Sequence, residues 1–195
     1  ELAFVEEAFS SNYIAPLGPH LDAFEKAVSK YLGNDLYCVG LSSGTASLHL
    51  ALLVAGVKQD DEVWVSSMTF AGGVFPINYI GAIPRFFDLN PKTWCIDVDI
   101  LSEELVKANK ENRLPKAIIP TDLYGQSVDI DSLESLAQKY NIPLLIDSAE
   151  SFGAEYKDGR KAGSGGDISI LSFNGNKIIT TSGGGMLVTK NKDWA

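Results

Sequence analysis

The chain has 195 residues, of which 45% are hydrophobic and 21% charged, and this length is enough to bury one sizeable core. A formal net charge of −9 argues against a nucleic-acid-binding surface, because no basic cluster interrupts the acidic balance. The longest apolar runs, such as residues 48–57, are too short to span a bilayer and no signal-peptide pattern opens the chain, so we expect a cytoplasmic protein without a membrane partner.

Strand and helix patterns alternate along the chain. The expected helices cover residues 19–31, 45–55, 71–80, 102–109 and 131–140. The expected strands cover residues 37–41, 62–66, 84–87, 117–120, 143–146, 168–173 and 183–189, with a short piece at 94–97. This alternation predicts an α/β fold with a mostly parallel sheet and helices on both of its faces.

Two patterns carry little functional content. The glycine-rich run 163–167 opens no crossover helix and lacks the dinucleotide-binding spacing, so it is interpreted as a plain turn. The cysteines Cys38 and Cys95 show no paired spacing, and the histidines His20 and His49 are scattered. We therefore expect no metal site.

The most informative residue is Lys177, which lies in a polar turn between the expected strands 168–173 and 183–189. A lysine held there, close to the core, can act as a nucleophile. Most lysines are ordinary solvated surface residues, and Lys177 alone does not outweigh that interpretation. The neighbouring motifs have to decide between the two.

Two such motifs follow expected strands. Asp147 directly follows the expected strand 143–146. In an open α/β sheet an acid at that point faces a ligand site. Taken alone, Asp147 is explained more simply as a cap of the next element. Residues 42–47 lead through small hydroxyl and glycine residues into a helix. A helix start of this kind suits a phosphate, and a plain N-cap is the alternative.

A lysine, an acid after a strand and a phosphate-type turn together match the needs of pyridoxal phosphate. The chain also resembles the DegT/DnrJ/EryC1/StrS sugar aminotransferases, which have the aspartate aminotransferase fold (PLP fold type I). The resemblance rests on five segments in the family's order: GPHLDAFEKAVSKYLG, LSSGTASLHLAL, SSMTFAGGV, IDSAESFGA and SFNGNKIITTSGGGML. They are spread over nearly the whole chain.

The resemblance implies roles for single residues. Lys177 would form the Schiff base with the cofactor and shuttle a proton between the substrate carbon and the C4′ carbon, which requires burial and the cationic cofactor to lower its pKa from about 10.4. Asp147 would hold the proton on the pyridine nitrogen and keep the ring an electron sink. Phe70 would stack on the ring, with ordinary core packing as its alternative.

The phosphate would be bound by Gly44 and Thr45 through backbone N–H groups and a hydroxyl, with a further hydroxyl from Ser172. Glu150 occupies the position near the cofactor's 3′-oxygen where many members have Gln or His. A carboxylate there resembles the members that act on UDP-linked 4-keto-6-deoxy-N-acetylhexosamines, the enzymes of bacillosamine-type pathways. One departure is Asp122 in TDLYG, where such enzymes have THLYG, and it concerns the substrate side of the pocket.

Family members run further, into a second, smaller domain, so we expect residues 1–195 to be a partial PLP-binding large domain. In this fold type a second subunit completes the pocket. The apolar residues Phe75, Tyr79, Phe86 and Phe87 lie within a short span, and not all of them are readily hidden under one sheet face. A homodimer is therefore expected.

The expected activity is transfer of an amino group from glutamate to C4 of a UDP-linked 4-keto-6-deoxy amino sugar. Three alternatives stay open. A PLP-dependent sugar dehydratase shares the fold, but in that branch a histidine typically replaces the lysine. A non-catalytic sugar-nucleotide sensor would not need both Lys177 and Asp147. A plain structural α/β domain leaves the co-occurrence of the motifs unexplained.

Overall fold

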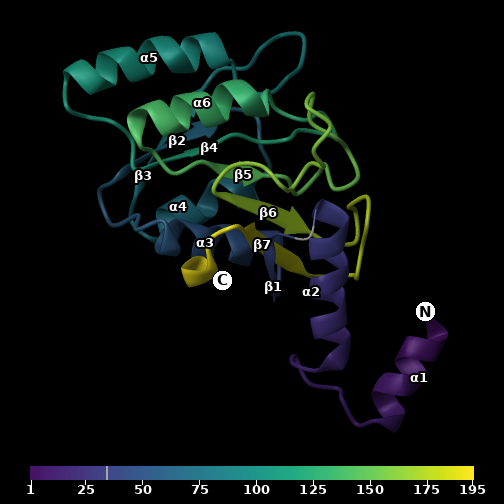
Figure 1. The fold of residues 1–195 in the computed structure, drawn as a ribbon. Helices are drawn as coiled ribbons and strands as arrows, with labels where there is room; N and C mark the ends of the chain where they lie inside the picture. The colour runs from purple at the N-terminus through teal and green to yellow at the C-terminus, as the bar shows by residue number, and fades with distance from the viewer. Residues whose placement is uncertain (34) are drawn as a thin grey trace.

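The computed structural model describes residues 1–33 and 35–195, and within them two sheets meet edge to edge (Figure 1). The larger sheet has the strand order β1-β7-β6-β5 and the smaller one β3-β2-β4. Parallel bridges between Ile118 and Leu144 and between Thr121 and Asp147 connect β4 to β5. The strands are β1 Tyr37–Leu41, β2 Glu62–Ser66, β3 Ile83–Phe87, β4 Ala117–Ile119, β5 Leu145–Asp147, β6 Ile168–Ser172 and β7 Gly185–Thr189.

In the larger sheet, β7 runs in the opposite direction to the other strands. Strand β2 is parallel to β3 and β4, and β5 is parallel to β6, whereas β7 is antiparallel to both β6 and β1. The reversal follows from the connection, because β6 and β7 are joined by a loop, residues 173–184, without a crossover helix. The predicted mostly parallel α/β fold is confirmed, and the reversed strand brings the loop that carries Lys177 to the end of β6.

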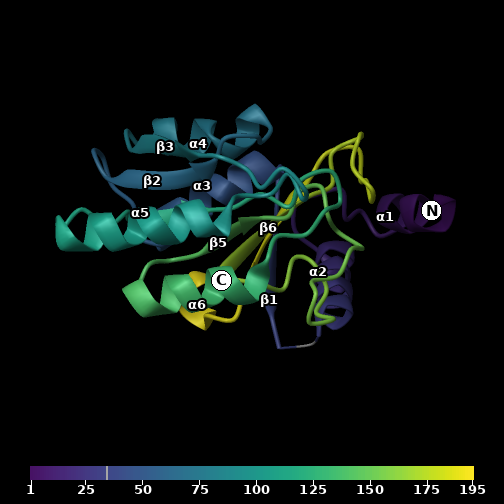
Figure 2. The same cartoon turned by 90° about the horizontal axis from the view of Figure 1, so that it is seen from above.

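The helices cover both faces of the sheet (Figures 1 and 2). Trp64 of β2 packs under α5 and α6, while its neighbours Val63 and Val65 join the core that contains α3 and α4. Alternate residues of a strand point to opposite faces, so one strand serves both cores. The helices are α1 Leu2–Ser10, α2 Pro19–Leu32, α3 Gly44–Val54, α4 Phe75–Tyr79, α5 Val98–Lys110 and α6 Ile130–Tyr140.

The predicted helices agree with the structure to within one residue at each end, except for two. The helix expected over 71–80 is split into a 3-10 turn, Ala71–Gly73, and α4, because two glycines weaken the helix and Pro76 is accommodated only in the first turn of α4. Helix α5 begins at Val98, earlier than the expected residue 102. The Asp97 side chain caps it by accepting hydrogen bonds from the N–H groups of residues 99 and 100 at 3.0 and 3.1 Å.

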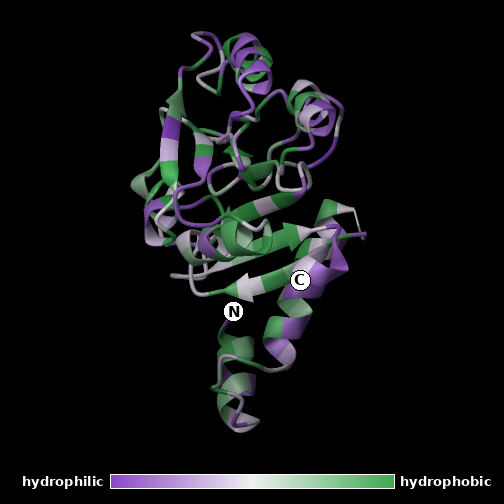
Figure 3. Ribbon diagram, turned by 90° about the vertical axis from the view of Figure 1, so that its left-hand side faces the viewer, coloured by the Kyte–Doolittle hydropathy of each residue, from purple (hydrophilic) through white to green (hydrophobic). Residues whose placement is uncertain are grey.

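Several large apolar side chains lie on the surface. Helix α1 buries none of its residues and lies apart from the sheet, with Leu2 and Phe9 exposed by 70% and 67% (Figure 3). As expected, not all of the four neighbouring apolar residues are hidden: Phe75, Tyr79 and Phe86 are exposed, whereas Phe87 is buried against Trp64. Within the described residues no helix is both long and apolar enough to cross a membrane.

Candidate active site

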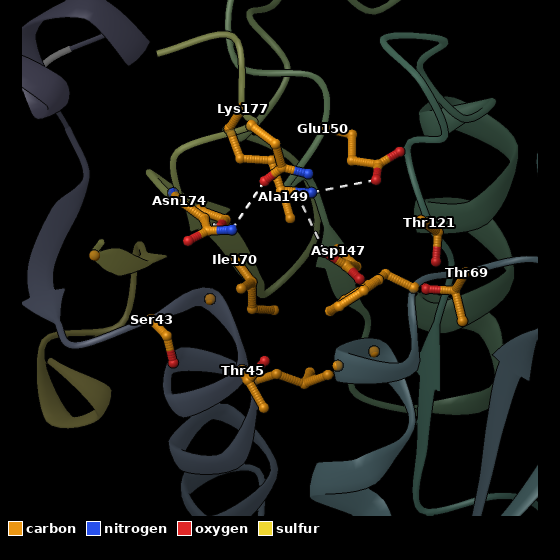
Figure 4. Close-up of a pocket in the computed structure, with 18 of the residues that line it drawn as sticks. Ser43, Thr45, Thr69, Thr121, Asp147, Ala149, Glu150, Ile170, Asn174 and Lys177 are labelled. Carbon is orange, nitrogen blue, oxygen red and sulfur yellow. Dashed lines mark hydrogen bonds and ion pairs between the residues drawn. The ribbon is translucent and has the colours of Figure 1, made fainter. Parts of the chain in front are cut away.

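A cavity of about 290 Å³ lies where β5 and β6 end and α3 begins (Figure 4). This is the carboxyl edge of the parallel strands, the usual place for a ligand in an open α/β sheet. Every site residue expected from the sequence lines this cavity: Gly44, Thr45, Phe70, Asp147, Glu150, Ser172 and Lys177. The fold thus brings together side chains that lie far apart in the sequence.

Lys177 is held in the cavity by a carboxylate. Its Nζ lies 3.2 Å from Oε1 of Glu150, and the two side chains are only 11% and 20% exposed. The loop that carries the lysine is fixed near its base, where the N–H of Thr181 donates to the carbonyl of Phe173 at 3.0 Å. Lys177 is therefore a largely buried amine with a defined position, unlike the solvated surface lysine of the alternative interpretation.

Asp147 ends β5 and is 6% exposed. One of its carboxylate oxygens accepts a hydrogen bond from the N–H of Ala149 at 3.2 Å. The pKa of Asp147 is raised to about 6. Burial is the main cause and the carboxylates of Asp122 and Glu150 add to it, while the hydrogen bond from Ala149 and the charge of Lys177 oppose the rise. A cationic N–H group bound next to this buried carboxyl group would stabilise its ionised form through a charge-assisted hydrogen bond.

The start of α3 forms another wall of the cavity. Ser43 caps the helix, its hydroxyl accepting from the N–H of Ala46 at 3.1 Å, and the N–H groups of Gly44 and Thr45 have no acceptor within the helix. A Cβ at residue 44 would lie 3.0 Å from the Cβ of Ser172, so glycine allows the end of β6 to approach closely. Together with the positive end of the helix dipole, these groups suit a phosphate.

Phe70 lies at the cavity and not in the core. The residue is 70% exposed, and the Nζ of Lys177 lies 5.9 Å from the centroid of its ring. This position excludes the alternative that Phe70 is an ordinary core residue. A flat group placed beside Lys177 would lie within reach of the ring, which agrees with the stacking role expected from the sequence.

Two further residues, Thr69 and Thr121, were not singled out from the sequence. Their hydroxyls are buried at the cavity without a hydrogen-bond partner among the described residues. In Figure 4 they lie on the opposite side of the cavity from Ser43 and Thr45. Buried polar groups normally have partners, so these two hydroxyls are available to a bound molecule. Thr69 lies in the motif SSMTF and Thr121 in TDLYG, and only this position in the sequence indicates that they belong to the site.

Asp122 corrects one expectation. Its departure from the family pattern was expected to concern the substrate side of the pocket, but its side chain is fully buried and does not line the cavity. The neighbouring residue Thr121 does line it. Successive residues at a strand end point to opposite sides, so Asp122 points away from the cavity.

The residues present fit pyridoxal phosphate. A lysine can bind its aldehyde, a buried carboxyl group with raised pKa can meet its ring nitrogen, and a helix start can hold its phosphate. Within the part of the chain that the structure describes, no group of three or more His, Cys, Asp or Glu residues could hold a metal ion.

Comparison with known proteins agrees with this assignment. The family model described as the DegT/DnrJ/EryC1/StrS aminotransferase family matches residues 1–195. EpsN of Bacillus subtilis (strain 168), assigned to the pyridoxal phosphate-dependent aminotransferases, is 45% identical over 192 residues, which cover 98% of this chain and 49% of that protein. A Campylobacter jejuni protein named UDP-4-amino-4,6-dideoxy-N-acetyl-beta-L-altrosamine transaminase is 40% identical over 176 residues, 90% of this chain and 45% of that protein.

A crystal structure of a DegT DnrJ EryC1 StrS aminotransferase from Brucella abortus has a TM-score of 0.91 at 29% identity, covering 98% of this chain and 51% of that one. Other relatives are named for GDP-linked and dTDP-linked sugars. The chain spans about half the length of the curated relatives it matches.

Proposed function

The chain belongs to the DegT/DnrJ/EryC1/StrS aminotransferase family, and we propose that it forms the cofactor-binding part of a pyridoxal phosphate-dependent enzyme that aminates a nucleotide-linked sugar. The observation that carries this proposal is that Lys177 and Asp147 face one cavity beside the start of α3. The name of EpsN supports the same cofactor.

When bound, pyridoxal phosphate supplies an aldehyde and a ring that withdraws electrons from the substrate carbon. Lys177 would hold it covalently and, once the amino substrate has displaced the lysine, would carry a proton between the substrate carbon and the C4′ carbon. Asp147 keeps a proton on the ring nitrogen by a charge-assisted hydrogen bond. Phe70 would lie against one face of the ring and exclude water from that face.

The remaining residues hold the ends of the cofactor. The N–H groups of Gly44 and Thr45 and the hydroxyl of Ser172 bind the phosphate. Glu150 accepts a hydrogen bond from the N–H of Tyr124 at 2.9 Å with one oxygen and contacts Lys177 with the other, so it fixes the position of the amine. It would lie near the 3′-oxygen of the bound cofactor.

For the substrate, we propose a UDP-linked 4-keto-6-deoxy amino sugar that is aminated at C4, with glutamate as the donor. Glu150 and the name of the Campylobacter relative support this choice. Because other relatives are named for GDP-linked and dTDP-linked sugars, the nucleotide is the first variable to test. The full-length protein should release 2-oxoglutarate and an amino sugar in equal amounts, with the UDP-sugar preferred over the GDP- and dTDP-sugars.

The sugar dehydratase is the second candidate, and Lys177 argues against it because that branch typically has histidine at this position. The same assay separates the two activities. Loss of a sugar hydroxyl without gain of an amine would identify the dehydratase and overturn the aminotransferase proposal.

We further propose that residues 1–195 are part of the large domain and that the whole protein is a homodimer. The exposed apolar side chains of α1, together with Phe75, Tyr79 and Phe86, support a covered surface in the complete protein. Sedimentation of the full-length protein tests this, and a monomer would contradict it.

Covalent capture tests the cofactor site. Borohydride reduction of the full-length protein loaded with pyridoxal phosphate should remove its visible absorbance and attach the cofactor to Lys177. Lys177→Ala should abolish the adduct. Lys161→Ala is the matched control, because Lys161 also pairs with a glutamate, Glu155, but lies outside the cavity. An adduct spread over several lysines would refute the assignment.

A further inference from the structure

A second carboxylate is buried behind Asp147. Asp122 is fully buried, and its two oxygens accept three hydrogen bonds: from the N–H of Val128 at 2.9 Å, the hydroxyl of Ser148 at 2.7 Å and the hydroxyl of Ser151 at 2.8 Å. None of these four residues lines the cavity. The mechanism above gives Asp122 no role, although a buried carboxylate is costly to maintain.

Each of the two serines bonded to Asp122 directly follows an acid near Lys177. Ser148 directly follows Asp147, and Ser151 directly follows Glu150. The main chains are tied as well, because the N–H of Asp122 donates to the carbonyl of Asp147 at 3.0 Å. Asp122 therefore holds the turn from Asp147 to Ser151 by hydrogen bonds near both of its ends, on the side away from the cavity.

We propose that Asp122 is a positioning residue of the active site, which holds Asp147 and Glu150 in place through the hydroxyls of Ser148 and Ser151. This inference rests on the proposed function, since it concerns the acids that would meet pyridoxal phosphate and Lys177. Asp122 itself does not touch the cavity.

The charge of Asp122 adds a second effect. Burial raises its pKa, while hydrogen bonds from Val128, Ser148, Ser151 and Tyr156 lower it. The other titratable groups that sense its charge are the Tyr156 phenol, the Cys95 thiol and Asp147. In its ionised form Asp122 raises the pKa of Asp147. A neutral residue at position 122 should therefore let Asp147 ionise at lower pH.

Asp122→Asn in the full-length protein tests the charge. The amide oxygen can still accept from Val128, and the serine hydroxyls can rotate to accept from the amide nitrogen, so the fold should be retained. Asp147 pairs with the ring nitrogen only when ionised, so the affinity of the wild-type protein for pyridoxal phosphate should fall as the pH drops through about 6. In Asp122→Asn that fall should move to lower pH.

The matched control is Asp129→Asn. Asp129 also accepts hydrogen bonds from a backbone N–H and a serine hydroxyl, both of Ser132, but it caps α6 away from the cavity. It should bind pyridoxal phosphate like the wild type at every pH. A pH profile of Asp122→Asn that matches the wild type would overturn the charge effect.

The double variant Ser148→Ala/Ser151→Ala tests the positioning and keeps the charge. It should bind pyridoxal phosphate about tenfold more weakly at pH 8, equivalent to about 1.4 kcal/mol. Wild-type affinity in this variant would overturn the positioning role. Absence of a borohydride-sensitive Lys177 adduct in the wild type would instead refute the proposed function, so the two failures are distinguishable.

Discussion

Replacement of Asp147 by asparagine should stabilise the cofactor-free protein. The pKa of Asp147 rises from 3.8 to about 6 on folding because the carboxyl group is buried. At about 1.4 kcal/mol for each pH unit, ionising it in the folded state costs about 3 kcal/mol. Asparagine has no charge to bury and can still accept the hydrogen bond from Ala149, so it avoids most of this cost.

The sign of the pH dependence follows from the raised pKa. The folded state binds the Asp147 proton more tightly than the unfolded state, so this group stabilises the wild type below pH 3.8, and that stabilisation is lost as the pH rises through 6. The advantage of Asp147→Asn should be largest at pH 8, at about 3 kcal/mol, and about half of that at pH 5.

Urea denaturation of the cofactor-free full-length protein at pH 5 and pH 8 measures this difference. Asp129→Asn is the control, because asparagine and aspartate are equally good N-caps. With saturating pyridoxal phosphate the order should reverse, since the wild type binds the cofactor more tightly and is stabilised more by it. An Asp147→Asn protein that is less stable than the wild type at pH 8, or whose advantage is the same at both pH values, would refute the reasoning.

Three further variants test other parts of the site. Gly73→Ala should weaken pyridoxal phosphate binding about tenfold or more, because the new Cβ would lie 2.5 Å from the Thr69 hydroxyl and 3.0 Å from an Asp147 oxygen. Unchanged affinity in a fluorescence titration would contradict this. Phe70→Ala should change the free energy of unfolding by less than about 0.5 kcal/mol, since the ring is exposed, yet lower cofactor affinity severalfold; a marked loss of stability would show that Phe70 supports the core. Glu150→Gln should keep cofactor binding and slow turnover, and equal kcat in the two proteins would remove Glu150 from the mechanism.

The sequence predicted the parts of the fold that depend on local pattern. Strand-helix alternation identified the α/β class, and apolar runs located the strands that carry Asp147 and Ser172. It failed where single residues override the pattern. The paired glycines and Pro76 broke one expected helix, and the Asp97 cap started another helix early.

The candidate site was predicted from motifs, and the structure adds what motifs cannot contain. Thr69 and Thr121 were missed because hydroxyl residues are common and only their burial without partners makes them notable. The motif TDLYG contains both Thr121 and Asp122 but does not show which of them lines the cavity, because a one-residue difference in position reverses the direction of a side chain and the position of the strand end is not readable from the sequence.

The loop that carries Lys177 joins two strands, β6 and β7, whose residues are all buried. Amide hydrogens in these strands should exchange with solvent only when the whole protein unfolds, whereas the loop residues 173–184, which are largely outside the core, should exchange through small local openings. The loop that carries Lys177 would then move while β6 and β7 stay folded. Lys177 could therefore change its contact from Glu150 to a bound molecule without any unfolding of the sheet.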